Sequence, residues 1–446
     1  MDDQPNPEGE QEQSLTVDEA LEMALGYLRK RQMEPAAEIL ERVVEFVPDN
    51  AVAWNYLGLI RCHLDGAAKG IELLRHAATL DANYAGLHNN IGNACVELRD
   101  IEGAIASYSR AIELDPEMAE AYNNLASIMI SRNEFEQAET LLRLGLQFAP
   151  EYGIAHHNLA SMLARQDRSV EAIPFFWKAA VYLPDKSATP PFLAVAYWNA
   201  GLKDEAIKYV REWAEAEPDN PLAQHMRASI TGEGVPLRAS NSYVEKLFDR
   251  FSNSFDAKLD KLDYRAPELV GDAVSLALGV PRGNRVILDA GCGTGKCAKY
   301  LRDHAARLIG VDLSNGMISK AAMLGAYDHL EHAELTAFLL AADEPYDLVV
   351  SADTLCYFGA LEEFSGAAAG ALTPDGRLIF TVEALDDEGT DDFRLAFHGR
   401  YAHRESYVMK TMKHAGFTIE RCVRDRLRVE STHPVIGLVV TAQRVA

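Results

Sequence analysis

A period of 34 residues is the feature that most constrains the fold of this chain. Prolines recur in step with it, with Ala82 at the one position where proline is missing: Pro48, Pro116, Pro150, Pro184 and Pro218. On this register six units begin at residues 17, 51, 85, 119, 153 and 187. Only alanine or glycine occupies the eighth and twentieth places of each unit. Small residues at this spacing let two helices approach closely, so the period predicts stacked helix pairs.

A 34-residue unit with small residues at places 8 and 20 and proline at place 32 resembles the tetratricopeptide repeat (TPR). The resemblance implies six repeats over residues 16–220, forming an all-α superhelix. The polar, acidic residues 1–15 predict a disordered tail. Residues 221–240 predict a capping helix and a linker.

A row of asparagines predicts what the repeats bind. The sixth place of three consecutive units is Asn90, Asn124 and Asn158. In TPR folds the first helix of each unit lines the groove, and an amide both donates to and accepts from an extended backbone. The row resembles the asparagine ladder of the O-linked N-acetylglucosamine transferases and predicts a bound polypeptide. The alternative is that these asparagines only satisfy the turns between helices.

The second half contains a strand, a glycine-rich turn and a helix. The next strand ends in an acid about twenty residues later, as in sites where a carboxylate binds ribose hydroxyls. Lys296 stands where a dinucleotide site needs a small residue, which disfavours NAD. No P-loop sequence occurs. Asp289, two residues before the first glycine, favours a ligand that carries positive charge.

The segments LDAGCGTG and VDLS resemble motifs I and II of the class I S-adenosylmethionine-dependent methyltransferases. The segment PVIGLVVTAQ resembles their terminal antiparallel hairpin. Together with the repeats, the chain resembles a bacterial family of TPR methyltransferases. The resemblance implies a Rossmann-like α/β domain over residues 281–446, a helical lead-in over 241–280, and S-adenosylmethionine as cofactor. It implies that the cofactor is held by Asp289, Gly291, Gly293 and Gly295 at the methionine end, Asp312 at the ribose, and Met317 and Glu334 at the adenine.

Methyl transfer from a sulfonium mainly needs alignment of the reacting atoms, and a base is needed only where the acceptor must lose a proton. The candidates for such a catalytic role are His403, Asp353 and Tyr401, with Tyr357 beside them. Residues 394–428 carry nine Lys and Arg against three acids. This stretch predicts either an anionic group on the acceptor or charges that protect helix and sheet edges.

The charge and the cysteine pattern of the chain limit which partners, metals and cellular locations are expected. The chain has 43 Lys and Arg against 67 Asp and Glu, a net charge of −24, which disfavours nucleic acid. Residues 1–240 hold 37 of the acids and 20 of the bases, so the partner of the repeats is expected to be neutral or basic. The six cysteines show no metal-ligand spacing, and no metal is predicted. The polar start and the lack of a long apolar run predict a cytoplasmic protein without a membrane span.

The sequence therefore predicts an S-adenosylmethionine-dependent methyltransferase whose repeats bind a polypeptide substrate or partner. One alternative is a methyltransferase of a small or lipid-linked metabolite that the repeats only tether in a complex. Another is a non-catalytic TPR scaffold with a cofactor-sensing domain. The acceptor atom and the oligomeric state are left open.

Overall fold

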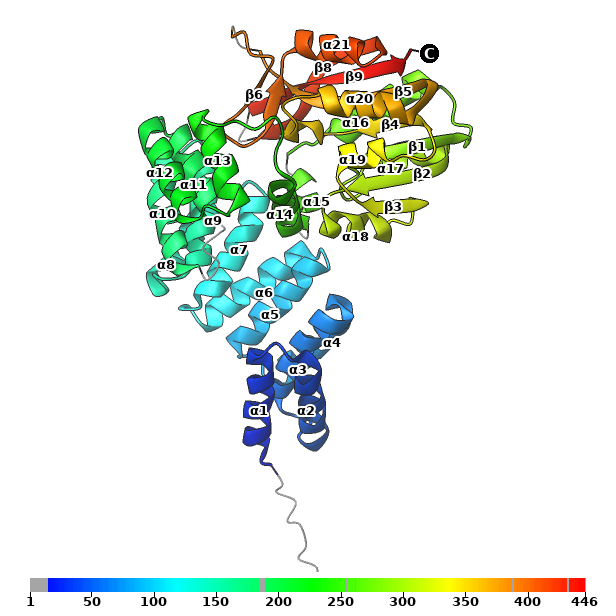
Figure 1. The fold of residues 1–446 in the computed structure, drawn as a ribbon. Helices are drawn as coiled ribbons and strands as arrows, with labels where there is room; N and C mark the ends of the chain where they lie inside the picture. Colours follow the sequence, from blue (N-terminus) through cyan, green and yellow to red (C-terminus); the bar gives the residue numbers. More distant parts are fainter. Residues whose placement is uncertain are drawn as a thin grey trace, which may run out of the picture. The chain divides into compact units, whose positions relative to one another are not determined.

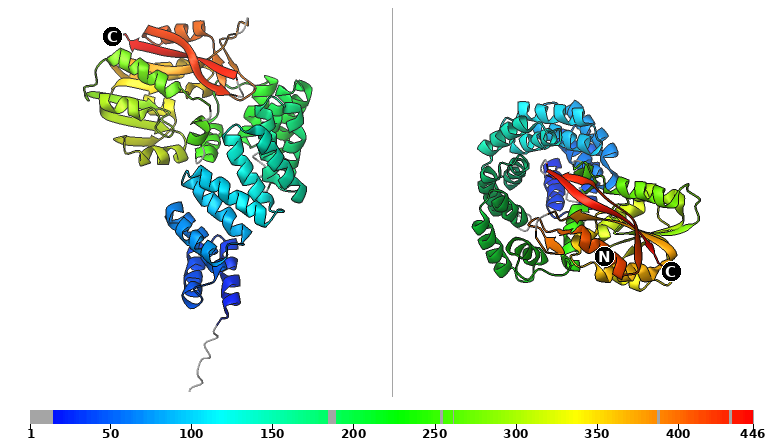
Figure 2. Two further views of the ribbon diagram at one scale, coloured as in Figure 1. Left: turned by 180° about the vertical axis from the view of Figure 1, so that it is seen from behind. Right: turned by 90° about the horizontal axis from the view of Figure 1, so that it is seen from above.

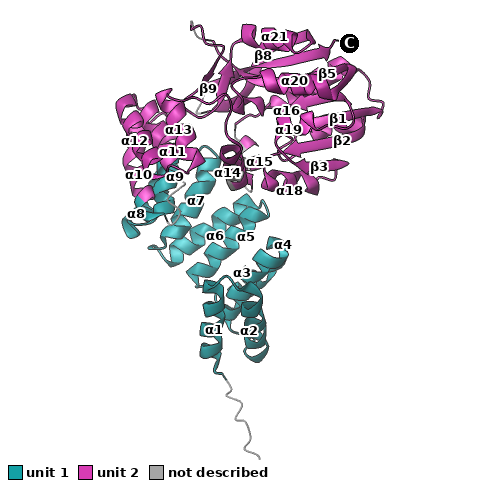
Figure 3. Ribbon diagram, viewed as in Figure 1, with its two compact units in different colours: residues 1–162, 181–184 teal, residues 163–180, 185–446 magenta. Residues whose placement is uncertain are grey.

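The computed structural model describes residues 15–183, 189–252, 255–260, 262–386, 389–430 and 433–445. The chain divides into two compact units (Figure 3). The first unit comprises residues 1–162 and 181–184, and the second comprises 163–180 and 185–446. Apart from Leu15, the predicted disordered tail lies outside the described residues.

The first unit consists of consecutive helix pairs (Figure 1). The helices that it contains in full are α1 (Val17–Arg29), α2 (Met33–Phe46), α3 (Ala51–Asp65), α4 (Ala67–Leu80), α5 (Ala85–Glu97), α6 (Ile101–Leu114), α7 (Ala119–Ser131) and α8 (Phe135–Phe148). Helix α9 (Gly153–Arg165) begins in this unit. The first helix of each pair begins where the 34-residue register places it, which confirms the predicted all-α repeat fold. None of the described helices has the length and apolar character needed to cross a membrane.

The small residues of the repeat lie where two helices of a pair meet. Ala24 and Ala36 have no exposed surface. A Cβ added to Gly70 would lie 2.2 Å from the Cys62 Sγ, and one added to Gly92 would lie 2.5 Å from the Tyr108 ring. The helices therefore approach more closely than a larger side chain permits.

The second unit begins with further helices that continue the repeat and lead into a sheet. They are α10 (Ser169–Tyr182), α11 (Pro190–Asn199), α12 (Lys203–Ala216), α13 (Pro221–Thr231), α14 (Asn241–Phe251), α15 (Phe255–Asp260) and α16 (Ala266–Leu278). Helix α13 starts at the side-chain cap of Asn220 and ends at Gly232, whose φ is 72°. Its contacts, described below, make it more than a cap for the repeats.

One sheet follows, in the strand order β3-β2-β1-β4-β5-β7-β6, with β9 joined to β5 and β8 joined to β9. Its strands are β1 (Arg285–Ala290), β2 (Ala305–Asp312), β3 (His329–His332), β4 (Tyr346–Ser351), β5 (Leu372–Ala384), β6 (Phe393–Leu395), β7 (Tyr401–His403), β8 (Phe417–Glu430) and β9 (His433–Arg444). Strands β1 to β5 are parallel, and β9 is antiparallel to both neighbours. The predicted Rossmann-like fold with a terminal antiparallel hairpin is confirmed.

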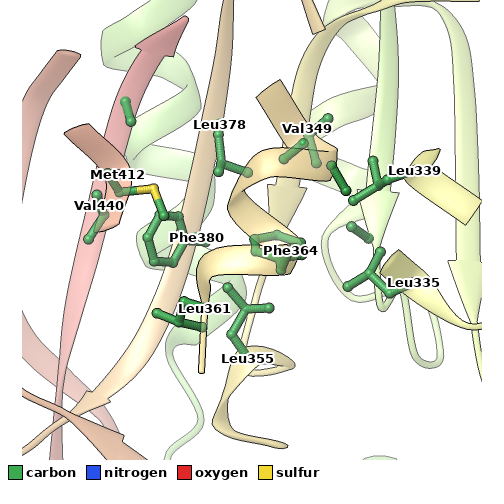
Figure 4. Packing of buried hydrophobic residues seen from close by; sticks show 14 of the residues in the cluster. Leu335, Leu339, Val349, Leu355, Leu361, Phe364, Leu378, Phe380, Met412 and Val440 are labelled. Atoms are coloured by element: carbon green, nitrogen blue, oxygen red, sulfur yellow. The ribbon is translucent and has the colours of Figure 1, made fainter. Parts of the chain in front are cut away.

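Helices cover both faces of this sheet (Figure 2). Between and after the strands lie α17 (Ala298–Leu301), η3 (Arg302–His304), α18 (Asn315–Met323), α19 (Leu335–Leu340), η4 (Leu355–Tyr357), α20 (Glu362–Ala371) and α21 (Glu405–His414). Because side chains alternate along a strand, β5 contributes side chains to two hydrophobic cores, one on each face of the sheet. Leu378 and Phe380 join the core with α19, α20 and α21 (Figure 4), whereas Ile379 joins the core with α16 and α17. The parallel strands end at one edge of the sheet, where ligands of such folds bind.

Candidate active site

The turn after β1 requires glycine. Gly291, Gly293 and Gly295 have φ values of 79°, 55° and 89°, a region that other residues rarely adopt. A Cβ on Gly291 would lie 2.2 Å from the Thr354 Oγ1, and one on Gly295 would lie 2.6 Å from the Leu324 Cδ1. Glycine is therefore required at Gly291 and Gly295 because a side chain would collide with Thr354 and Leu324, whereas a Cβ on Gly293 would meet no atom within 4 Å.

Asp312, the last residue of β2, is joined to this turn. Its Oδ2 accepts a hydrogen bond from the Gly293 N–H at 2.9 Å, and its Oδ1 accepts one from the Ser314 N–H at 2.9 Å. Burial raises the pKa of Asp312, and these backbone N–H groups oppose that rise. The structure thus brings the predicted ribose-binding acid against the predicted methionine-binding turn.

Asp289 lies below the turn with 1% of its surface exposed. One of its carboxylate oxygens accepts a hydrogen bond from the Tyr327 hydroxyl at 2.7 Å. Burial raises the pKa of Asp289 to about 7, a rise that the Tyr327 hydrogen bond opposes and the nearby Asp312 carboxylate favours. A cation bound beside this carboxylate would favour its charged form.

Met317 and Glu334, assigned by resemblance to the adenine, both have other contacts in the structure. Met317 lies in the first turn of α18 and is 1% exposed. Glu334 caps α19, accepting hydrogen bonds from the N–H groups of Thr336 at 3.1 Å and Ala337 at 2.8 Å. It also forms an ion pair with Arg238 of the linker at 2.5 Å.

Two acids from the lead-in helices bond to the glycine turn and to the start of α18. Asp249 of α14 accepts hydrogen bonds from the Ser314 hydroxyl at 2.5 Å and the Gly316 N–H at 3.2 Å. Asp256 of α15 accepts one from the Thr294 hydroxyl at 2.7 Å. Neither residue was predicted as a site residue, although their spacing of seven in FDRFSNSFDAKL was available as a signal.

Five charged residues form an ion network at the ends of β4, β5 and β8: Asp353, Glu383, Arg400, Arg428 and Glu430. The Arg428 Nη1 donates to both carboxylate oxygens of Asp353 at 2.8 Å, its Nε donates to Glu430 at 2.6 Å, and its Nη2 donates to Glu383. Arg400 donates to Glu383 at 2.7 Å and to Glu430 at 2.5 Å. Among the described residues, Asp353, Glu383 and Cys356 also have metal-ligand spacing, but Arg428 already bonds to both carboxylates.

The three predicted catalytic residues differ in their surroundings. His403 is fully buried, its Nε2–H donates to the Gly359 carbonyl at 3.0 Å, and burial lowers its pKa to about 4. The Tyr401 hydroxyl is buried and donates to the Pro236 carbonyl at 2.8 Å. Asp353, which belongs to the ion network, keeps 15% of its side chain exposed. Of the three, Asp353 has the most accessible reactive group.

The basic stretch 394–428 is largely neutralised in space. Besides Arg400 and Arg428, three of its arginines pair with nearby acids. These pairs are Arg394 with Asp391, Arg424 with Asp386 and Glu405, and Arg426 with Asp263. Most of these acids lie outside the stretch in sequence, so partners from other segments compensate the charges of these five arginines.

The asparagine row of the first unit forms a ladder between repeats. Each of its amides donates to the asparagine that stands one place earlier in the preceding repeat. The pairs are Asn90 with Asn55 at 2.9 Å, Asn124 with Asn89 at 3.0 Å, and Asn158 with Asn123 at 2.8 Å. The partners are asparagines within helices of the preceding repeat, not turns between helices, and they account for one N–H of each amide. In the described part of the chain, no donor reaches the side-chain oxygen of Asn90 or Asn158.

We expect Asn124→Ala to lower the free energy of unfolding of the first unit by about 1–3 kcal/mol, because it leaves the partly buried Asn89 oxygen without its donor. The Asn124 Nδ2 also donates to the Asn93 oxygen at 3.2 Å, which keeps the Tyr108 hydroxyl as a second donor. Hydrogen exchange of the α5 and α7 amides measures the effect. Asn83→Ala, at an exposed turn, is the matched control and is expected to change stability by less than about 0.5 kcal/mol. Equal effects of the two variants would contradict the ladder.

Comparisons with known proteins agree with both halves of the fold. Residues 288–380 match the family model of a methyltransferase domain, and residues 92–130 match that of a TPR repeat. Malonyl-[acyl-carrier protein] O-methyltransferase of Enterobacter lignolyticus is 36% identical over 115 residues, 26% of this chain and 45% of that protein. Human methyltransferase-like protein 27 is 34% identical over 117 residues, 26% of this chain and 46% of that protein. This chain thus spans less than half the length of either relative.

A solved structure, from the functional characterization of Pseudomonas aeruginosa pilF, is similar to this chain with 20% sequence identity and a TM-score of 0.42. The match covers 48% of this chain and 96% of that chain.

The residues of the site can be compared with what the cofactor requires. S-adenosylmethionine, the cofactor of class I methyltransferase domains, fits the residues present: a glycine turn with open space beside Gly293, a buried acid for positive charge, and Asp312 at the next strand end. The chain therefore contains a region that matches a TPR repeat and a region that matches a methyltransferase domain.

Proposed function

We propose that this chain is an S-adenosylmethionine-dependent methyltransferase whose acceptor group belongs to a polypeptide held by the repeats. The observation that carries the proposal is the hydrogen bond between Asp312 and Gly293, which assembles a cofactor site in a chain that also contains a TPR array. The cofactor supplies an activated methyl group, so the protein mainly has to align the acceptor and exclude water.

The proposal assigns the following roles to this chain's residues. The three glycines leave room for the methionine end of the cofactor, Asp289 faces its positive charge, and Asp312 holds the ribose hydroxyls. Met317 and Glu334 border the adenine, and the carboxylate of Glu334 is kept in place by its helix cap and Arg238. Asp353, His403 and Tyr401 remain the proposed catalytic residues.

The polypeptide part of the proposal is supported by the first unit. A hollow of about 580 Å³ there is lined by the acids Glu120 and Glu151 together with Ala119, Ala149, Pro150 and Tyr152. The oxygens of Asn90 and Asn158 offer acceptors to backbone N–H groups. Both features favour an extended, neutral or basic polypeptide in the array, consistent with 37 acids against 20 bases in residues 1–240.

Transfer of labelled methyl groups tests the proposal. The full chain is incubated with cell lysate and S-adenosylmethionine that carries a radioactive methyl group. We expect the label in the protein fraction. Label found only in small molecules or lipids would reject the polypeptide acceptor, and binding of S-adenosylhomocysteine without any transfer would favour the non-catalytic scaffold.

The second candidate is a methyltransferase of a small or lipid-linked metabolite. The relative from Enterobacter lignolyticus, whose name states O-methylation of a malonyl group on a carrier protein, is the observation that favours it. Removing the first repeats distinguishes the two candidate functions, because the truncated chain is expected to keep full turnover only if it methylates a small or lipid-linked metabolite. The cut belongs near residue 151, between α8 and α9. Helices α11 and α13 must stay, since His225 bonds to the Gly399 carbonyl at 2.8 Å and Trp198 stacks on Phe397.

A further inference from the structure

The ion network contains one more acid than base. Its two guanidinium groups, of Arg400 and Arg428, face the three carboxyl groups of Asp353, Glu383 and Glu430. The Arg428 and Glu383 side chains are only 3% and 6% exposed, so water screens this imbalance poorly. The network lies at the carboxyl ends of β4, β5 and β8, the edge at which a parallel sheet presents its ligand.

The surplus negative charge is concentrated on Asp353. Glu383 and Glu430 each bond to both arginines, whereas Asp353 bonds to Arg428 alone. Burial raises the pKa of Asp353, and Arg428 only partly offsets the rise. Asp353 also has a φ of 56°, so its backbone adopts a conformation that aspartate tolerates better than most residues. This carboxylate is therefore the member of the network with spare capacity for a proton.

Buried histidine nitrogens on the neighbouring hairpin also have no hydrogen-bond donor. His403 donates its Nε2–H to the Gly359 carbonyl, so its Nδ1 carries a lone pair. This Nδ1 is buried and has no partner among the described residues, and the same is true of the Nδ1 of His398. His403 itself is fully buried and lies opposite Ala384 in the strand pairing, so its side chain faces away from that of Glu383. His398 lies in the same hairpin as Arg400 and interacts electrostatically with Glu383 and Glu430. A ligand that brings N–H or O–H groups would satisfy its buried Nδ1.

We propose that the ion network is the acceptor subsite and that the acceptor is an amine, with Asp353 as the group that takes its proton. The inference rests on the proposed methyltransferase function and names its substrate class. An ammonium brings one positive charge, which balances the surplus acid of the network, and three N–H donors. A carboxylate acceptor would add a fourth negative charge to a site that already holds three.

The proposed step is balanced as follows. The acceptor ammonium gives one proton to the Asp353 carboxylate and becomes a neutral amine. Its nitrogen lone pair forms the new C–N bond while the C–S bond to the methyl group breaks, and that electron pair stays on sulfur. The products are a methylated ammonium, S-adenosylhomocysteine and protonated Asp353, which then loses its proton to water.

The chemical stability of the product tests the substrate class. Protein labelled by the wild-type chain in lysate is treated with alkali, which hydrolyses methyl esters to volatile methanol and leaves N-methyl groups in place. We expect the label to stay non-volatile and to appear in methylated lysine or in an N-methylated terminal residue after acid hydrolysis. Release as methanol would overturn the amine assignment while leaving the methyltransferase function intact. No transfer to any acceptor would reject the function and the inference with it.

Asp353→Asn tests the proposed proton acceptor. Asparagine keeps the size of the side chain and tolerates the positive φ. We expect a loss of transfer of about 100-fold or more, whereas calorimetry should show S-adenosylhomocysteine binding within about twofold of wild type, since Asp353 is not assigned to the cofactor. Asp375→Asn is the matched control, because Asp375 is exposed and has a φ of 64°. The role of Asp353 as proton acceptor would be overturned in either of two cases. Asp353→Asn could transfer methyl groups as fast as the control variant, or its affinity for S-adenosylhomocysteine could fall as much as its transfer rate.

Discussion

Replacing Asp312 with alanine is expected to weaken S-adenosylhomocysteine binding by about 100-fold, as measured by calorimetry. A carboxylate that accepts two ribose hydroxyls supplies hydrogen bonds to a charged group, each worth about 1.5–3 kcal/mol, and about 1.4 kcal/mol corresponds to a tenfold change in affinity. The substitution also removes the two hydrogen bonds that tie the glycine turn to β2. Both losses act on the cofactor site.

A matched control separates binding from folding. Asp272→Ala changes an exposed aspartate on α16 and is expected to bind the ligand as the wild type does. Far-ultraviolet circular dichroism checks that both variants keep their secondary structure. Absence of binding by the wild type would overturn the cofactor assignment, and undiminished binding by Asp312→Ala would remove Asp312 from the site.

Replacing Arg428 with alanine is expected to cost about 3–5 kcal/mol of stability, because it leaves buried carboxylates without their main counterion. Arg428 bonds to Asp353, Glu383 and Glu430, and its own side chain is 3% exposed. Hydrogen exchange of the β8 and β9 amides in the full chain measures the change where it occurs. Arg424→Ala is the control: it lies on the same strand and also pairs with two acids, but its side chain is 46% exposed. We expect it to cost less than about 1 kcal/mol, and equal costs for the two variants would contradict a buried network.

The stability that Arg428→Ala loses relative to the wild type should depend on pH. The two arginines lower the pKa of Glu383, and they lower that of Glu430 to about 2. A carboxyl group with a lowered pKa stabilises the fold above its ordinary pKa, and that contribution is lost as the pH falls toward the folded value. Without Arg428, the pKa values of Glu383 and Glu430 are lowered less, so the variant has less of this stabilisation to lose as the pH falls. Its deficit relative to wild type should therefore be full at pH 7 and shrink as the pH falls below about 4.5.

The repeats and the cofactor turn were predictable because each depends on residues close in sequence. The small residue at place 8 of a repeat meets the second helix of the same pair, so Gly92 and its register already indicate a close contact such as the one with Tyr108 at place 24. In the same way, the glycine turn and Asp312 belong to one strand-turn-helix-strand unit. The Asn90 row was also visible, but its pairing with Asn55 of the preceding repeat required coordinates.

The contacts of the basic stretch could not be predicted in this way. Counted along the chain, residues 394–428 have an excess of positive charge, which suggested an anionic acceptor as one interpretation. In the fold, Arg428 meets Asp353, which lies 75 residues away, and Arg426 meets Asp263, which lies 163 residues away. A count over a sequence window leaves such partners out. The resulting network carries one surplus acid and favours the opposite charge on the acceptor.

By itself, the sequence determined two things about this protein: a stack of 34-residue helix pairs and a glycine turn with an acid at the next strand end. Both follow from short-range steric rules, since small residues are needed wherever backbones come close. Only the tertiary structure decided which charges compensate each other at the ends of β4, β5 and β8. Electrostatic energy depends on distance and burial in space, and the strand order of a parallel sheet brings together residues that the sequence keeps far apart.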